Sequence, residues 1–277
     1  MALIDAKIYS EALMKDVDVS VILPLPSITN LEYGDDVPIP TIEEKYQTLW
    51  LLHPGTNDYS KLVRRTKIEG YARENRIAVV MMDLGHSYCY NVPNLGNYFD
   101  YYTEELPKIL RGIFPLSDKK EDNFIGGISM GGFGAFMAAA RKPDNYAAAF
   151  SISGGLDLER VLADNERTRD YMQRIMNLVY GENRQYYQAH EHDIYTMMDD
   201  LVATQSAYPQ FYACSGTDDE LYHASKVVVD YMQSIGIQVD YEEGPGNHNF
   251  DFYDPQLKHI LAEWLPLKSG LISKGEN

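Results

Sequence analysis

The feature that most constrains this chain is a serine between two glycines, set between a short apolar run and an Ala-rich segment. The apolar run covers 123–128, the Ala-rich segment covers 130–141, and Ser129 stands between them. In a strand, turn and helix of this kind, the apical serine adopts a strained backbone conformation and the strand end nearly touches the helix start. Small residues are therefore needed at Gly127 and Gly131. The pattern predicts that Ser129 stands at the N-terminus of a helix, whose dipole favours negative charge.

Length and charge limit the class of protein. The chain has 277 residues, of which 45% are hydrophobic, and this suits a single α/β domain over 1–277. A net charge of −17 without a basic stripe excludes nucleic-acid binding and disfavours anionic membranes. The sequence contains neither an N-terminal targeting pattern nor an apolar run of membrane-spanning length. Two cysteines make no disulfide framework. We therefore expect a cytoplasmic protein.

Strand and helix patterns alternate along most of the chain. An N-terminal hairpin is expected at 4–13 and 16–24, and surface loops at 25–46 and 84–98. The expected strands are 46–53, 76–83, 123–128, 146–153, 210–215 and 237–242, and the expected helices are 59–75, 100–114, 130–141, 221–235 and 254–264. Such alternation predicts an α/β fold with a mainly parallel central sheet and helices on both faces.

The segment 156–206 differs in character from the rest of the chain. It is long, charged and helical in pattern, with Met and Tyr residues interleaved, and it lies between two expected strands. This position predicts a helical insertion that forms a partial cap over the strand ends, near the active site.

Polar loops follow four of the expected strands, and the carboxyl ends of parallel strands meet at one edge of a sheet. The chain order there is Ser129, then acidic residues, then His248. A serine needs an adjacent imidazole to accept its proton, and the imidazole needs a carboxylate on its other nitrogen. Asp218, Asp219 and Glu220 all follow the strand 210–215, and local sequence does not choose among them.

An oxyanion formed by attack of Ser129 needs two backbone N–H donors. One belongs to the residue after the nucleophile, Met130, and the other to the loop that follows the first central strand. That loop reads His53-Pro54-Gly55. Because proline has no N–H, Gly55 is the predicted donor.

A group of metal-ligating residue types occurs at His190-Glu191-His192-Asp193. Histidines at i and i+2 do not share a helix face, and no third ligand pairs with them by spacing. This segment is interpreted as a solvated polar loop. We expect neither a metal nor a cofactor.

Five segments spread over nearly the whole chain resemble the esterase D/tributyrin esterase family of α/β-hydrolases. They are Trp50–Gly55, Asp100–Pro107, Gly126–Gly134, Ser215–Tyr222 and Gly246–Phe250. The family also contains S-formylglutathione hydrolases, acetylxylan and feruloyl esterases, and mycolyltransferases. The resemblance implies an α/β-hydrolase fold and metal-independent ester hydrolysis through an acyl-enzyme. By position it implies Ser129 as nucleophile, His248 as base and Asp219 as acid.

The chain departs from the family pattern near the site. Pro54 follows His53 where the family has Gly, Glu220 follows the acid where an aromatic is usual, and Phe250 replaces a Trp. The Cys-containing oxyanion loop of the S-formylglutathione hydrolases is absent.

The leading hypothesis is a serine carboxylesterase for short-chain acyl esters, including acetyl or feruloyl esters of carbohydrates. The alternatives are a thioesterase of the S-formylglutathione hydrolase type and a non-catalytic carbohydrate-binding relative. The expected partner is a small-molecule or carbohydrate ester, and the sequence leaves acyl transfer and a homo-oligomer open.

Overall fold

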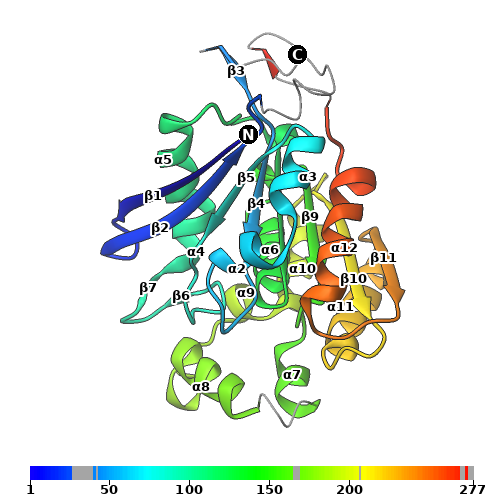
Figure 1. Cartoon of the computed structure of the whole chain (residues 1–277). Helices are drawn as coiled ribbons and strands as arrows, with labels where there is room; N and C mark the ends of the chain where they lie inside the picture. The colour runs from blue at the N-terminus through cyan, green and yellow to red at the C-terminus, as the bar shows by residue number, and fades with distance from the viewer. Residues whose placement is uncertain (27–39, 42, 165–168, 206, 269–271, 274–277) are drawn as a thin grey trace.

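The computed structural model describes residues 1–26, 40–41, 43–164, 169–205, 207–268 and 272–273 (Figure 1). The strands are β1 (Ala2–Ser10), β2 (Lys15–Leu23), β3 (Glu44–Lys45), β4 (Thr48–Leu52), β5 (Ala78–Met82), β6 (Asn91–Val92), β7 (Gly96–Asn97), β8 (Asn123–Ile128), β9 (Ala148–Ile152), β10 (Gln210–Gly216), β11 (Val239–Gly244) and β12 (Ile272–Ser273). The α-helices are α2 (Ser60–Arg65), α3 (Ile68–Glu74), α4 (Tyr98–Asp100), α5 (Leu106–Ile113), α6 (Met130–Arg141), α7 (Leu158–Asp164), α8 (Arg169–Tyr180), α9 (Ala189–His192), α10 (Ile194–Thr204), α11 (Tyr222–Ser234) and α12 (Phe250–His259). Shorter helical turns occur at Lys120–Asp122, Pro143–Asn145 and Glu182–Arg184, and π-helical turns at Tyr101–Glu105 and Ile260–Trp264.

The central sheet has eight strands in the order β1-β2-β5-β4-β8-β9-β10-β11. Neighbouring strands pair in parallel throughout the run β5-β4-β8-β9-β10-β11, whereas the predicted N-terminal hairpin adds β1 and β2 as an antiparallel edge. Each parallel pair is joined by a crossover that contains helix, as βαβ units require. The mainly parallel sheet predicted from the sequence is therefore confirmed.

Helices cover both faces of the sheet and enclose two apolar cores (Figure 1). Successive residues of β4 alternate between them: Leu49 and Leu51 belong to the core that includes residues of α2, α3 and α12, whereas Trp50 and Leu52 belong to the core that includes residues of α5, α6 and α11. Because both faces are buried, the central strands are almost wholly apolar. This rigid sheet holds the loops at its carboxyl edge.

The turn between β8 and α6 has the geometry that the glycine pattern predicts. Ser129 lies between them with φ 56° and ψ −117°, a sparsely populated conformation for a residue with a side chain. A Cβ atom on Gly127 would lie 2.3 Å from the backbone carbon of Gly131, and one on Gly131 would lie 2.3 Å from the Leu52 carbonyl oxygen. Glycine is therefore required at both positions, and the turn projects the Ser129 side chain beyond the strand ends.

Two expected helices differ from the observed ones for identifiable reasons. The helix expected over 59–75 is broken between α2 and α3, because the Thr66 hydroxyl accepts from Ile68 N–H and the Asp254 carboxylate accepts from Lys67 N–H. The final helix begins at Phe250 rather than at 254, because the Asn249 side chain caps the first turn of α12.

Other boundaries shift less. The expected loop 84–98 contains the short antiparallel pair of β6 and β7. The helix expected over 100–114 starts at Tyr98 and includes a π-helical turn. The expected loop 25–46 lies mostly outside the described residues.

The insertion 156–206 contributes α7 to α10, and its residues 165–168 and 206 are outside the described part. Figure 1 shows α7 and α8 beyond the carboxyl end of the parallel strands, whereas α10 packs beside α6. Both cysteines are free and buried, and burial raises the pKa of each thiol. None of the described helices combines the length and the apolar character that crossing a bilayer requires.

Candidate active site

Three side chains from three loops form a hydrogen-bonded chain at the carboxyl edge of the sheet. His248 Nε2 lies 2.9 Å from Ser129 Oγ, and His248 Nδ1 lies 2.9 and 3.0 Å from the two carboxylate oxygens of Asp219. Because a carboxylate only accepts, Nδ1 carries the proton, and Nε2 is free to accept from the serine hydroxyl. The imidazole is therefore held in the tautomer that a general base for Ser129 requires.

Asp219 is the acidic residue that contacts the imidazole. Its side chain is fully buried, and it also accepts a hydrogen bond of 2.7 Å from the Leu221 N–H. Asp218 and Glu220 are exposed. The turn in which Asp219 N–H donates to the Gly216 carbonyl directs these three consecutive carboxylates differently, with only the middle one facing His248.

The ring of Tyr253 backs His248, with its centroid 5.5 Å away in an edge-to-face arrangement. Burial raises the pKa of Tyr253, and the nearby carboxylates of Asp219 and Glu220 raise it further. The phenol therefore stays neutral and packs against the imidazole without competing for its proton.

His53 fixes the loop after β4 from inside the protein. Its ring is completely buried, its Nε2 accepts from Leu84 N–H at 2.9 Å, and its Nδ1 lies 2.8 Å from the Pro54 carbonyl oxygen. Since Nε2 accepts, Nδ1 must carry the proton and donate to Pro54. A peptide unit is planar, so fixing the Pro54 carbonyl also fixes the opposite direction of the Gly55 N–H.

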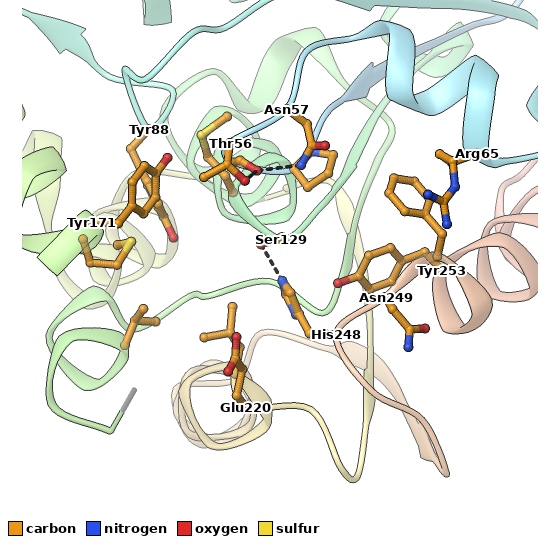
Figure 2. Close-up of a pocket in the computed structure, with 17 residues that line it drawn as sticks. Thr56, Asn57, Arg65, Tyr88, Ser129, Tyr171, Glu220, His248, Asn249 and Tyr253 are labelled. Atoms are coloured by element: carbon orange, nitrogen blue, oxygen red, sulfur yellow. Dashed lines mark hydrogen bonds between the residues drawn. The ribbon is translucent and has the colours of Figure 1, made fainter. Parts of the chain in front are cut away.

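Gly55 is held from its other side as well. Its carbonyl oxygen accepts from Thr56 Oγ1 at 2.6 Å and from Asn57 Nδ2 at 2.8 Å, as Figure 2 shows. Gly55 lies against Met130, because a Cβ atom on Gly55 would be 3.6 Å from the Met130 Cβ. Met130 is the first residue of α6, where backbone N–H groups have no partner within the helix. The residues of the two predicted oxyanion donors, Gly55 and Met130, are thus in contact with each other, and Met130 directly follows Ser129.

Ser129 and His248 line a cavity of about 350 Å³. Its lining includes Val161, Tyr171 and Met172 of the insertion, together with Asn57, Arg65, Asn249, Phe250 and Tyr253. Figure 2 shows Tyr88 and Tyr171 on one side of Ser129, and Arg65 and Tyr253 on the other. The insertion therefore builds one wall of the cavity, close to Gly55.

The segment 190–193 is not the solvated polar loop that its sequence indicates. Residues 189–192 form α9, and His192 is buried among the rings of Tyr90, Tyr180 and Tyr187. Burial in this aromatic cluster lowers the pKa of His192. Within the described part of the chain, no three His, Cys, Asp or Glu side chains are arranged to hold a metal ion.

Comparison with known proteins identifies the family. Residues 10–264 match the Esterase family, whose description is "Putative esterase". The chain belongs to this esterase family. The esterase is 25% identical over 275 residues to an acetyl esterase from Caldicellulosiruptor saccharolyticus, a match that covers 96% of this chain and 98% of that protein.

Two solved structures from Staphylococcus aureus are similar to the esterase. One is FphF, a fluorophosphonate-binding serine hydrolase with substrate bound, at 29% identity and a TM-score of 0.80. The other is the S-formylglutathione hydrolase FrmB, at 30% identity and a TM-score of 0.78. Both matches cover 94% of the esterase and 97% of the other chain. The chain is thus a carboxylic ester hydrolase with an α/β-hydrolase fold.

Several residues of the site were not predicted from the sequence. The sequence did contain a signal for the supporting role of His53, because a histidine directly before the predicted oxyanion donor can reach the backbone of that loop. The sequence contained no such signal for three other residues that line the cavity, since each reaches it from a distant part of the chain: Tyr88, Tyr171 and Arg65.

Proposed function

We propose that this esterase is a serine carboxylesterase that hydrolyses short-chain acyl esters through Ser129, His248 and Asp219. The observation that carries this proposal is the hydrogen-bonded chain from Asp219 through His248 to Ser129 at the wall of a cavity. This arrangement supplies a nucleophile, a base in the required tautomer and a carboxylate that stabilises the imidazolium.

The first half of the reaction forms an acyl-enzyme. Ser129 Oγ attacks the ester carbonyl carbon while His248 Nε2 takes the hydroxyl proton. The Gly55 and Met130 N–H groups bind the resulting oxyanion. The tetrahedral intermediate then expels the alcohol, which receives its proton from His248. In the second half, His248 activates a water molecule that attacks the acyl carbon and releases the acid.

The size of the cavity and the wall formed by the insertion favour substrates with a short acyl chain. A cavity of about 350 Å³ is near the lower end of the roughly 300–1,000 Å³ typical of ligand pockets. We assign the acyl group to the side lined by Val161, Tyr171 and Met172, so that the insertion 156–206 acts as a partial cap within a single domain. The similarity to an acetyl esterase supports acetyl as one acyl group, and acetyl or feruloyl esters of carbohydrates are candidate substrates.

A panel of esters tests this proposal. We expect hydrolysis of p-nitrophenyl acetate and butyrate. The value of kcat/KM should fall steeply toward octanoate, because Tyr88 and Tyr171 limit the length of acyl chain that fits. Methyl ferulate and acetylated xylan, measured beside them, report on aromatic acyl groups and on polymeric sugars. A rate that increases up to octanoate would contradict the short acyl pocket.

A thioesterase of the S-formylglutathione hydrolase type is the second candidate, favoured by the 30% identity to FrmB. The same three residues would attack a thioester carbonyl. Turnover of S-formylglutathione, compared with that of p-nitrophenyl acetate under the same conditions, separates the two functions. If kcat/KM for the thioester greatly exceeds that for the ester, the thioester is the preferred substrate and the thioesterase function is favoured.

The loop anchored by His53 gives a prediction about kcat. We expect His53→Leu to lower kcat on p-nitrophenyl acetate about 10- to 100-fold, less than the loss of a whole oxyanion donor, because Gly55 N–H loses its fixed direction. His53→Asn should retain more activity, since its amide can still donate to the Pro54 carbonyl. Thermal unfolding of both variants controls for lost stability. Equal kcat values in equally stable Leu and Asn variants would show that this hydrogen bond is unimportant.

A further inference from the structure

The cavity lining includes an arginine that has no acidic partner among the residues that the structure describes. Arg65 is the last residue of α2, is exposed, and lines the cavity. Its guanidinium carbon lies 5.3 Å from the ring centroid of Phe250, at the start of α12. Among the described residues, no carboxylate comes within ion-pair distance of Arg65.

This lack of a partner is notable in so acidic a chain. The sequence has 41 Asp and Glu residues against 24 Lys and Arg residues. Glu220 also lines the cavity, but Figure 2 places it on the other side of His248 from Arg65. The arginine therefore provides a local positive charge on one side of the catalytic histidine, within a protein whose overall field repels anions.

The support from Phe250 leaves the guanidinium able to bind a ligand. A ring face stabilises a cation without occupying its N–H groups, and those groups match the two oxygens of a carboxylate. Figure 2 places Arg65, which lies over the ring of Phe250, on the opposite side of Ser129 from Tyr171, a residue of the apolar wall. With the acyl group against that wall, the alcohol part of the ester extends toward Arg65.

We propose that Arg65 makes the enzyme select esters whose alcohol part carries a carboxylate. This inference rests on the proposed function, because it assigns the two sides of the same cavity. The carboxylate is bound before and after bond cleavage alike, so Arg65 contributes to substrate affinity rather than to the chemical step, and its effect should appear in KM.

Two acetate esters that differ in charge test the inference. The substrates are 4-acetoxybenzoate and its neutral analogue 4-acetoxybenzamide, which share the acetyl group. We expect Arg65→Gln to lower the ratio of their kcat/KM values about fivefold, as for one exposed charge pair, mainly by raising KM for the anion. The preference of the wild type should also weaken in high salt.

Arg64→Gln is the matched control. Arg64 precedes Arg65 on α2, is exposed, hydrogen-bonds to Ser60 and does not line the cavity. Its removal changes the net charge equally and should leave the ratio unchanged. An equal fall in both variants, or no fall in Arg65→Gln, would overturn the inference.

An ester with its carboxylate in the acyl part tests the orientation. Arg65→Gln should affect p-nitrophenyl hemiglutarate less than 4-acetoxybenzoate, and the opposite order would overturn the assignment of the alcohol side. If the wild type hydrolyses neutral esters but fails these comparisons, only the role of Arg65 is wrong. If it hydrolyses no ester, the proposed function itself fails.

Discussion

Ser129→Ala is expected to lower kcat on p-nitrophenyl acetate by about a millionfold, because the acyl-enzyme cannot form without the hydroxyl. Alanine tolerates the conformation at φ 56° about as well as serine does, so the fold and its thermal stability should be retained. The measurement is the initial rate of purified variants, with thermal unfolding as the check on folding.

Ser153→Ala provides a control matched in position and backbone. Ser153 directly follows β9, the neighbouring strand, and also has positive φ, at 49°. Its hydroxyl is buried and has no hydrogen-bond partner among the described residues. This variant should keep wild-type turnover. A fluorophosphonate probe, which loses fluoride as it bonds to a serine oxygen, should label Ser153→Ala but not Ser129→Ala. Undiminished hydrolysis by Ser129→Ala would refute the mechanism.

The second large effect is expected at the acid. Asp219→Asn should lower kcat about 10,000-fold, because an amide N–H facing His248 Nδ1 favours the tautomer whose Nε2 already carries a proton. Such an imidazole cannot accept the proton of Ser129. The introduced amide keeps an oxygen for the Leu221 N–H, so the loss should be one of activity rather than folding.

Asp218→Asn changes the same charge one residue away. Because Asp218 is exposed and does not contact the imidazole, its kcat should remain within about twofold of the wild type. Both variants are measured at one pH and ionic strength. A greater loss in Asp218→Asn would move the acid by one position and contradict the geometry.

Local patterns predicted the elements that local physics determines. The strand 123–128 and the helix from 130 to about 141 agree with β8 and α6, because the tight turn at Ser129 specifies where the strand ends and where the helix begins. The break after α2 escaped prediction since Asp254, which binds the Lys67 N–H, is far away in the sequence. The early start of α12 had a local signal in Asn249, the helix-capping residue that the periodicity alone did not reveal.

The site shows the same division between local and long-range information. Chain order was sufficient to nominate Ser129 and His248, and the family resemblance nominated Asp219, which the sequence alone could not separate from Asp218 and Glu220. The cavity walls could not be predicted, because they depend on how α2, α8 and the loop after β5 meet in space.

The hydrogen-bonded chain and the apolar wall come from separate parts of the gene. The three reactive residues follow different strands of the sheet: Ser129 follows β8, Asp219 follows β10 and His248 follows β11. The residues of the apolar wall lie in one contiguous stretch between β9 and β10, and they are Val161, Tyr171 and Met172. If the acyl group binds against this wall, as we propose, replacing that stretch should change which acyl group fits without altering the distances that the reaction needs. For directed evolution, codons 158–180 are thus the compact region to randomise, with the reactive residues kept constant.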